Sequence, residues 1–320
     1  MSELIEIIDK NILIETKFEK HKTMTNEIVL KLDTCGFKKE SELVRNCASY
    51  LLFSSQKNIN TSATRLQLKK ANFCKFRFCN MCNWRRSINT SRKLLEALEF
   101  VEHKTKISYL FLTLTIQNPL IQNLKETTEH LNKSFQRMSQ TKAYKNAVLG
   151  SFKTLEILGD NTKDGEAHPH FHILLVVKSS YFTSRDYINH DAWVQMWQDA
   201  LRVDYEPFVD VRKVRTIELN KDKNLTALQS AVFEVAKYTL KHTELTRKNC
   251  NDFTHIINQT KNMRFYSAGG FLKDMLDFIK NDEEILNLKK EENLKWEEIE
   301  ELLYRWKDGN YFLKEQKNSS

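Results

Sequence analysis

The sequence predicts an α+β fold in which a central antiparallel β-sheet is flanked by helices. Three observations support this prediction. Apolar and polar residues alternate over residues 107–116, a turn-rich loop at 160–167 separates two further strand-like segments, and helical and extended segments follow one another without a strict βαβ order. A chain of 320 residues, 41% of them hydrophobic, is long enough to bury such a core.

Four regions are expected along the chain. They are an N-terminal helical segment at 1–45, a basic cysteine-bearing module at 46–105, the α+β domain at 106–275 and a charged C-terminal helix at 276–320. Within the α+β domain the patterns predict strands at 107–116, 152–158, 168–175 and 208–217, and helices at 123–140, 187–201 and 226–241. The loop at 160–167 makes the second and third strands an antiparallel hairpin.

The C-terminal helix is expected to be amphipathic. Its apolar positions are Trp296, Ile299, Leu302, Leu303 and Trp306, set in a highly charged stretch. We expect this apolar face to pack on its own domain, and pairing with a second copy of the chain, as a homodimer, is the alternative.

Composition excludes several classes of protein. A formal net charge of +8 and a pI near 9.0 permit binding to a polyanion without requiring it. The chain has no run of about 18 apolar residues, and residues 1–15 lack the basic start and small-residue cleavage site of a secretory signal. We therefore expect a cytoplasmic protein with no membrane partner. The absence of a G-x-x-x-x-G-K-[ST] motif excludes a P-loop nucleotide hydrolase.

Three histidines, His168, His170 and His172, recur at every second position of the third predicted strand. Side chains two residues apart in a strand point to the same face, so the three imidazoles are expected to lie side by side. This pattern favours a metal site over three unrelated histidines. Two imidazoles with one carboxylate leave coordination positions open, which suits a catalytic Mn²⁺ or Mg²⁺ ion.

A second candidate metal site lies in the cysteine-bearing module. Cys74, Cys79 and Cys82 follow a C-x4-C-x2-C spacing. Cytosolic chains rarely keep disulfides, so this spacing favours a structural Zn²⁺ site. Cys47 is the expected fourth ligand, and Cys35 is the alternative.

Basic and aromatic residues surround the cysteines and recur on a later strand. Cations with interleaved aromatics can hold phosphates and stack on bases, although they can also form a solvated face around the metal. The expected DNA-contacting residues are Lys75, Arg77, Trp84, Arg85 and Arg86 in the cysteine module, and Arg212, Lys213 and Arg215 on the fourth predicted strand.

Glu234, Tyr238 and Lys241 fall on one face of the predicted helix at 226–241. A neighbouring ammonium lowers the pKa of a tyrosine hydroxyl, and a nearby carboxylate can carry a proton, so this face suits a tyrosine nucleophile. Taken alone, such residues more often pack or form ion pairs.

In this order the motifs resemble those of the HUH endonucleases, and in particular the rolling-circle replication initiators of small bacterial plasmids, in their zinc-binding, single-tyrosine branch. The resemblance covers roughly residues 45–275. It is carried by the cysteine group, Phe111-Leu112-Thr113-Leu114-Thr115, His168-Pro169-His170-Phe171-His172 and Glu234-x-x-Lys237-Tyr238-x-x-Lys241.

The resemblance implies a sequence-specific, metal-dependent nickase. Tyr238 would attack a phosphodiester of the plasmid origin and become joined to the 5′ phosphate, and the freed 3′ hydroxyl would prime synthesis. His170 and His172 would hold the divalent ion. The third ligand would be Glu156 by first choice, with His168 as the alternative and the loop acids Asp160, Asp164 and Glu166 as weaker candidates.

The resemblance also implies roles for Glu234 and for partners. Glu234 would activate water for the closing cleavage, or else pair with Lys237 or Lys241. The DNA substrate would be single-stranded or extruded as a hairpin at the nick, next to a duplex. Because phosphodiester exchange needs no ATP, a host helicase would unwind the plasmid for a DNA polymerase. Two other readings remain, an HUH transposase or relaxase and a non-catalytic zinc-dependent DNA-binding regulator.

Overall fold

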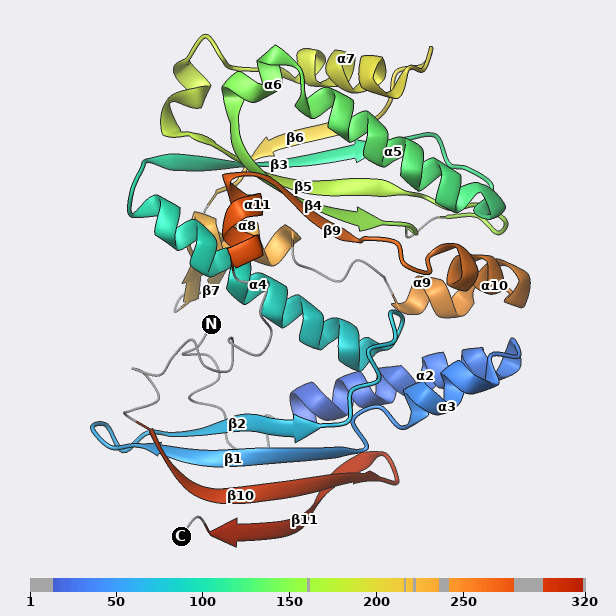
Figure 1. The fold of residues 1–320 in the computed structure, drawn as a ribbon, viewed down its shortest axis with the longest axis vertical. Helices are drawn as coiled ribbons and strands as arrows, with labels where there is room; N and C mark the ends of the chain where they lie inside the picture. Colours follow the sequence, from blue (N-terminus) through green and yellow to red (C-terminus); the bar gives the residue numbers. More distant parts are fainter. Residues whose placement is uncertain are drawn as a thin grey trace. The chain divides into compact units, whose positions relative to one another are not determined.

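The computed structural model describes residues 14–159, 162–215, 217–220, 223–235, 242–278 and 296–318. The chain divides into two compact units, Met1–Arg86 with Asn281–Ser320 and Ser87–Lys280. Each unit is built on its own antiparallel sheet with helices beside it (Figure 1). The α+β prediction is therefore confirmed, with two sheets in place of a single central one.

The first unit contains a four-stranded sheet in the order β11-β10-β1-β2. Its strands are β1 (Tyr50–Asn58), β2 (Thr64–Ala71), β10 (Trp296–Lys307) and β11 (Asn310–Asn318), and its helices are η1 (Ile14–Glu19), α2 (Lys20–Thr34) and α3 (Lys38–Arg45). The helices agree with the predicted N-terminal helical segment. Phe53 on β1 is buried and packs edge-on against Phe18 of η1, with ring centroids 5.4 Å apart.

The predicted C-terminal helix is wrong, because residues 296–318 form the β10–β11 hairpin. β10 pairs with β1, which places Leu302 opposite Phe53 and Tyr304 opposite Leu51. Apolar residues at 296, 299, 302, 303 and 306 fit a helical period, but Leu302 and Tyr304 also fit a strand period and are the buried ones. Pairing with a strand about 250 positions earlier decides between the two, and no local pattern reveals that partner.

The second unit contains a five-stranded sheet in the order β6-β3-β5-β4-β9 and a small β7–β8 pair. Its strands are β3 (Ile107–Thr115), β4 (Val148–Glu156), β5 (His170–Lys178), β6 (Val209–Lys213), β7 (Ile217–Asn220), β8 (Lys223–Leu225) and β9 (Tyr266–Gly270). β4 and β5 pair in antiparallel fashion, as the turn-rich loop between them predicts.

Helices cover both faces of this sheet (Figure 1). The helices of this unit are α4 (Asn80–Glu102), whose first turns belong to the first unit, η2 (Ile121–Asn123), α5 (Leu124–Ser139), α6 (Lys142–Ala147), η3 (Ser179–Thr183), α7 (His190–Leu201), α8 (Ala227–Val235), α9 (His242–Arg247), α10 (Cys250–Gln259) and α11 (Phe271–Phe278). On one face, Phe111 and Leu174 form a core with apolar residues of α4, α8 and α11. On the other face, Phe171 packs against Phe135 of α5, with ring centroids 6.1 Å apart.

Most predicted elements of this unit are present within a few residues of their expected bounds. The predicted helices at 123–140 and 187–201 are α5 and α7, and the basic strand at 208–217 is β6, which ends at Lys213. The predicted helix at 226–241 is α8 as far as Val235, and positions 236–241 lie outside the described residues. Every helix in the described ranges is too short or too polar to span a lipid bilayer.

Candidate metal centres

Glu156, His170 and His172 converge on one point of the second sheet. Each offers a ligand atom within 4.8 Å of the others. His170 Nε2 lies 3.4 Å from Glu156 Oε2, His172 Nε2 lies 3.5 Å from Glu156 Oε1, and the two Nε2 atoms are 3.2 Å apart. Two imidazole nitrogens and a carboxylate oxygen are a donor set that suits a catalytic divalent ion. This group is called the histidine–glutamate group below.

Strand register explains why these three side chains meet. Glu156 on β4 is paired with His170 on β5, so the two side chains leave the same face of the sheet. His172, two residues further along β5, faces the same way. The side chains of His170 and Glu156 are 8% and 15% exposed, and that of His172 is 25% exposed, so the group opens to solvent on the His172 side.

Hydrogen bonds orient both imidazole rings. The Nδ1 atom of His170 lies 2.8 Å from the carbonyl oxygen of His168, and the Nδ1 atom of His172 lies 3.3 Å from the hydroxyl of Thr113. Both bonds leave the Nε2 atoms turned toward Glu156. Burial opposes ionisation of Glu156, but His170 and His172, which donate hydrogen bonds to the carboxylate when their rings are doubly protonated, outweigh burial and lower the pKa of the Glu156 carboxyl group to about 2.

His168 does not join the other two histidines as a ligand in the group, contrary to the expectation that all three imidazoles lie side by side. β5 begins at His170, because Pro169 has no N–H to donate to a strand partner. The His168 ring stacks at a tilt on His170, and its Nδ1 atom is 2.6 Å from Asn118 Oδ1. The structure therefore brings Glu156, the first choice for the third ligand, to the histidine pair.

The loop acids are also outside the group. The Asp164 side chain is 81% exposed and lies 3.9 Å from Lys248 Nζ, and Glu166 forms an isolated bridge with Leu120. Asp160 falls outside the described residues.

Helix α8 covers the same face of the sheet as the histidine–glutamate group. Its Val232 and Val235 pack with Phe111 on β3 and Leu174 on β5. Phe111 and Leu174 are paired across the two strands, and the next pair on the same face is Thr113 with His172. Glu234 belongs to α8, but its side chain, like Tyr238 and Lys241, lies outside what the structure describes. Tyr238 comes three residues after the end of α8 in the sequence, and its role as the nucleophile stays a prediction.

The second candidate centre is formed by Cys47, Cys74, Cys79 and Cys82, called the cysteine group below. Their sulfur atoms lie within 4.8 Å of one another, with Cys47–Cys82, Cys74–Cys82 and Cys79–Cys47 separations of 3.6 Å. A tetrahedral Zn²⁺ about 2.3 Å from each sulfur would hold the sulfurs roughly 3.8 Å apart, so the arrangement fits that ion. Cys47 thus completes the group, and Cys35, at the C-cap of α2, is not part of it.

Backbone donors and one buried lysine surround the cysteine group. The N–H of Cys74 donates to Cys47 Sγ at 3.4 Å, and that of Lys75 donates to Cys82 Sγ at 3.3 Å. Hydrogen bonds from the other three thiols lower the pKa of Cys79. Lys22 is 1% exposed, and its Nζ donates to the carbonyl oxygens of Arg45 at 2.8 Å and Cys47 at 2.5 Å.

Sequence reasoning missed Lys22. Burial lowers the pKa of its ammonium group, while the charges of Cys47, Cys79 and Cys74 act in the opposite direction. A lysine on a polar helix, 25 residues before Cys47, carries no local signal of such a contact. Only the folded arrangement of α2 beside Cys47 reveals it.

The expected DNA-contacting residues of the cysteine module have mixed surroundings. Trp84 stacks on His21 at 4.6 Å and packs edge-on against Phe18 at 4.9 Å, so its ring is part of the packing of the first unit. The Arg85 guanidinium lies 5.4 Å from the Phe73 ring, and Arg86 donates to Asn83 at 2.6 Å. Lys75 is exposed, whereas Arg77 is half-buried.

Of the expected basic residues of the second unit, Arg212 lies near the histidine–glutamate group, whereas Lys213 points to the other face of the sheet. The Arg212 guanidinium is 5.3 Å from the centroid of the Phe111 ring, which is in turn 5.6 Å from the His172 ring. Arg212 also pairs with Asp210 at 3.6 Å. Lys213 lies over the Phe182 ring at 4.4 Å, and Arg215 is exposed just after the strand. The Phe111 ring therefore lies between Arg212 and His172, a candidate metal ligand.

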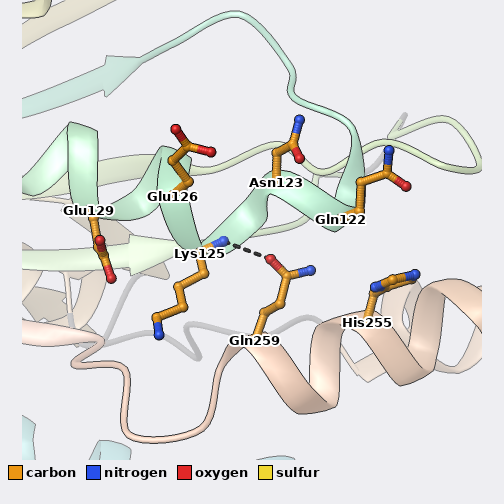
Figure 2. A pocket seen from close by; sticks show the side chains of 7 residues that line it. All are labelled: Gln122, Asn123, Lys125, Glu126, Glu129, His255 and Gln259. Atoms are coloured by element: carbon orange, nitrogen blue, oxygen red, sulfur yellow. Dashed lines mark hydrogen bonds between the residues drawn. The ribbon is translucent and has the colours of Figure 1, made fainter.

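A polar pocket lies between the start of α5 and α10 (Figure 2), and none of its lining residues belongs to either group. It is lined by Gln122, Asn123, Lys125, Glu126, Glu129, His255 and Gln259. The backbone N–H of Lys125 donates to Gln259 Oε1 at 2.9 Å across it. Its two carboxylates and its imidazole do not converge on a shared point as those of the histidine–glutamate group do.

Comparison with known proteins gives a consistent result. Residues 65–312 match the family described as "Replication protein". A "Protein rep" of Bacillus amyloliquefaciens is 33% identical over 74% of this chain and 72% of its own length. A "Protein rep" of Lactiplantibacillus plantarum is 33% identical over 86% of this chain and 88% of its own length. A "Protein rep" of Streptococcus pneumoniae is 32% identical over 83% of this chain and 82% of its own length. No solved structure gives a significant match.

Proposed function

The chain belongs to the replication protein family, and on this premise we propose that it starts rolling-circle replication of a plasmid by nicking one strand of the origin. One observation carries the proposal. Glu156, His170 and His172 form a three-ligand group that is open on one side and lies on the sheet face covered by α8. Catalytic metal sites keep coordination positions open for a substrate, whereas structural sites do not.

The histidine–glutamate group would hold Mn²⁺ or Mg²⁺. When bound, the ion supplies Lewis acidity that polarises the scissile phosphate. His170 presents Nε2 because its Nδ1 is engaged by the His168 carbonyl, and Glu156 supplies a carboxylate that is ionised well below neutral pH. Arg212, beside Phe111, would exchange its pairing with Asp210 for a phosphate of the bound strand.

Tyr238 is the proposed nucleophile. Its oxygen forms a bond to the scissile phosphorus, the bond from phosphorus to the 3′ oxygen breaks, and the proton lost by the tyrosine is balanced by one gained at the released 3′ hydroxyl. Lys241, one helical turn away in sequence, would favour the tyrosinate. Glu234, on the same predicted face, would take a proton from the water that ends the reaction.

The first unit is proposed to bind the duplex next to the nick. The cysteine group would hold a structural Zn²⁺, and exposed bases such as Lys75 would contact phosphates. The 3′ hydroxyl would prime synthesis by a host DNA polymerase, while a host helicase unwinds the plasmid. Phosphodiester exchange conserves the energy of the bond, which fits a chain without a P-loop motif.

A covalent-adduct assay tests this proposal. Labelled single-stranded origin DNA is incubated with the protein and Mn²⁺, and a protein–DNA band that survives denaturation in SDS is expected. Tyr238→Phe should abolish the band, whereas Tyr187→Phe, a change at an exposed tyrosine outside the group, should leave it unchanged. DNA binding without any cleavage would contradict the nickase and support a non-catalytic DNA-binding regulator.

A further inference from the structure

We infer that Thr113 is a positioning residue for the histidine–glutamate group, because its hydroxyl holds the His172 ring and permits that ring to change tautomer when a divalent cation binds. The inference rests on the proposed metal site and deepens it. It also gives a role to the Phe111-Leu112-Thr113-Leu114-Thr115 segment, which the proposed reaction does not otherwise use.

The contact follows from strand register. Thr113 on β3 pairs with His172 on β5, so the two side chains leave the same face of the sheet as neighbours. The Thr113 hydroxyl is 3.3 Å from His172 Nδ1, on the side of the ring away from Glu156. Thr113 is 9% exposed, so water has little access to replace this bond. The Phe111 ring, 5.6 Å from His172, borders the same imidazole.

The two histidines are held by chemically different partners. His170 Nδ1 faces the carbonyl oxygen of His168, which can only accept a hydrogen bond. The proton of a neutral His170 is therefore fixed on Nδ1, and its Nε2 lone pair is available to a cation. His172 Nδ1 faces a hydroxyl, which can accept or donate. One histidine is therefore fixed as a ligand, and the other is adjustable.

This difference matters because of the short distance between the two Nε2 atoms. The two Nε2 atoms are 3.2 Å apart, and that of a neutral His170 carries no proton. While no cation is present, the N–H at His172 Nε2 can therefore donate to both His170 Nε2 and the Glu156 carboxylate. In that state the Thr113 hydroxyl donates to Nδ1. A cation requires the Nε2 lone pair, so the proton must move to Nδ1, and the hydroxyl then accepts from it. Valine has the same shape as threonine but can do neither.

Thr115 provides a matched control. It lies on the same strand, two residues after Thr113, faces the same way and is 8% exposed. Its hydroxyl donates to the carbonyl oxygen of Phe208 at 3.0 Å and has no bond to a ring of the group. Replacing either threonine by valine removes one buried hydroxyl from β3, but only one of the two replacements removes a partner of a ligand.

The experiment measures Mn²⁺ binding by calorimetry to the full-length protein and to Thr113→Val, Thr113→Ser and Thr115→Val. Partners of metal-ligating histidines typically change affinity by about 10- to 100-fold when lost. We expect Thr113→Val to weaken Mn²⁺ binding by about that factor, and Thr113→Ser and Thr115→Val to bind within about threefold of the wild type. The ¹⁵N resonances of the His172 ring in the wild type should show the proton on Nε2 without a cation and on Nδ1 once Mg²⁺ is saturating.

The outcomes separate this inference from the proposed function. Equal Mn²⁺ affinity of Thr113→Val and the wild type overturns the role of Thr113, while adduct formation by the wild type would leave the nickase standing. Equal losses in Thr113→Val and Thr115→Val also overturn it, because they would indicate general damage to β3. A wild type that binds no Mn²⁺ overturns the metal site and this inference together.

Discussion

The two candidate metal centres differ in how completely the protein encloses them. The cysteine group presents four sulfur atoms, of which Cys47, Cys79 and Cys82 are buried, and backbone N–H groups and Lys22 complete its surroundings. The histidine–glutamate group presents three ligands and is open on the His172 side. A closed tetrahedral site favours a role in holding the fold together, and an open site favours contact with a substrate. If this comparison holds, loss of a ligand from the cysteine group should mainly lower stability, and loss of a ligand from the histidine–glutamate group should mainly lower the rate of DNA cleavage.

The largest expected effect is that of Cys79→Ser. Structural Zn²⁺ contributes about 10–16 kcal/mol of apparent binding free energy in small domains, and the serine oxygen is a poor replacement for a buried thiolate. We expect the variant to lose its Zn²⁺ and several kcal/mol of unfolding free energy. Metal content by mass spectrometry and thermal unfolding check this. An unchanged Zn²⁺ content would remove the structural role of the cysteine group.

The reciprocal change, His170→Ala, should leave Zn²⁺ content close to that of the wild type and should lower stability less than Cys79→Ser does, because only one partner of Glu156 is lost. Loss of one ligand of the open site should lower the rate of nicking by about a thousandfold, or about 4 kcal/mol of activation free energy. Nicking of single-stranded origin DNA and binding of duplex DNA are measured side by side. Loss of both together would indicate misfolding and would weaken the contrast between the two centres.

A smaller effect is expected from Glu156→Gln in acid. Burial opposes ionisation, but hydrogen bonds from His170 and His172 lower the pKa of Glu156 to about 2, below an unfolded value near 4.3. A lowered folded pKa means that its stabilisation is complete above pH 4.3 and is lost as the pH falls toward 2. The shift corresponds to about 3 kcal/mol.

Urea unfolding of chelator-treated protein between pH 6 and pH 2 measures this contribution. The wild type should lose about 3 kcal/mol more than Glu156→Gln between pH 4.3 and pH 2, and the two curves should run parallel above that window. Parallel curves through the whole range would show that the carboxylate is not paired with the imidazoles.

The smallest expected effect is that of Lys22→Met. The change keeps an apolar side chain of similar length but removes the cation and the donor to the Cys47 carbonyl. We expect Zn²⁺ affinity to fall by about tenfold, or about 1.4 kcal/mol, in competition with a chromophoric chelator. Lys20→Met, at an exposed position of the same helix, is the control and should leave the affinity unchanged. An equal effect of both changes would mean that Lys22 contributes only to the net charge of the helix.

The sequence predicted those features that depend on local spacing. The alternation of residues 107–116 predicted β3, the turn-rich loop predicted the β4–β5 hairpin, and the hairpin in turn brings Glu156 opposite His170. The spacing of Cys74, Cys79 and Cys82 predicted that these thiols lie together, and the structure brings Cys47, the expected fourth member, to them in place of the alternative, Cys35.

Two of the features that sequence analysis missed depend on partners far away along the chain, and one depends on a single proline. The β10–β11 hairpin has a helix-like apolar spacing, and only pairing with β1 selects the extended form. Pro169 shortens β5 and removes His168 from the group, although the alternation of the three histidines is unbroken. Lys22 contacts the Cys47 carbonyl only because the tertiary fold brings them together, so no residue spacing in the sequence indicates this contact.

The central claim is that the hydroxyl at position 238 lies beside a cation held by His170 and His172. The most direct measurement places 3-fluorotyrosine at position 238 and records its ¹⁹F resonance while Mn²⁺ is added. One equivalent of Mn²⁺ should broaden the resonance beyond detection, Mg²⁺ should leave it sharp, and His170→Ala should abolish the broadening. A resonance that stays sharp with Mn²⁺ bound would place the tyrosine away from the cation and contradict the account.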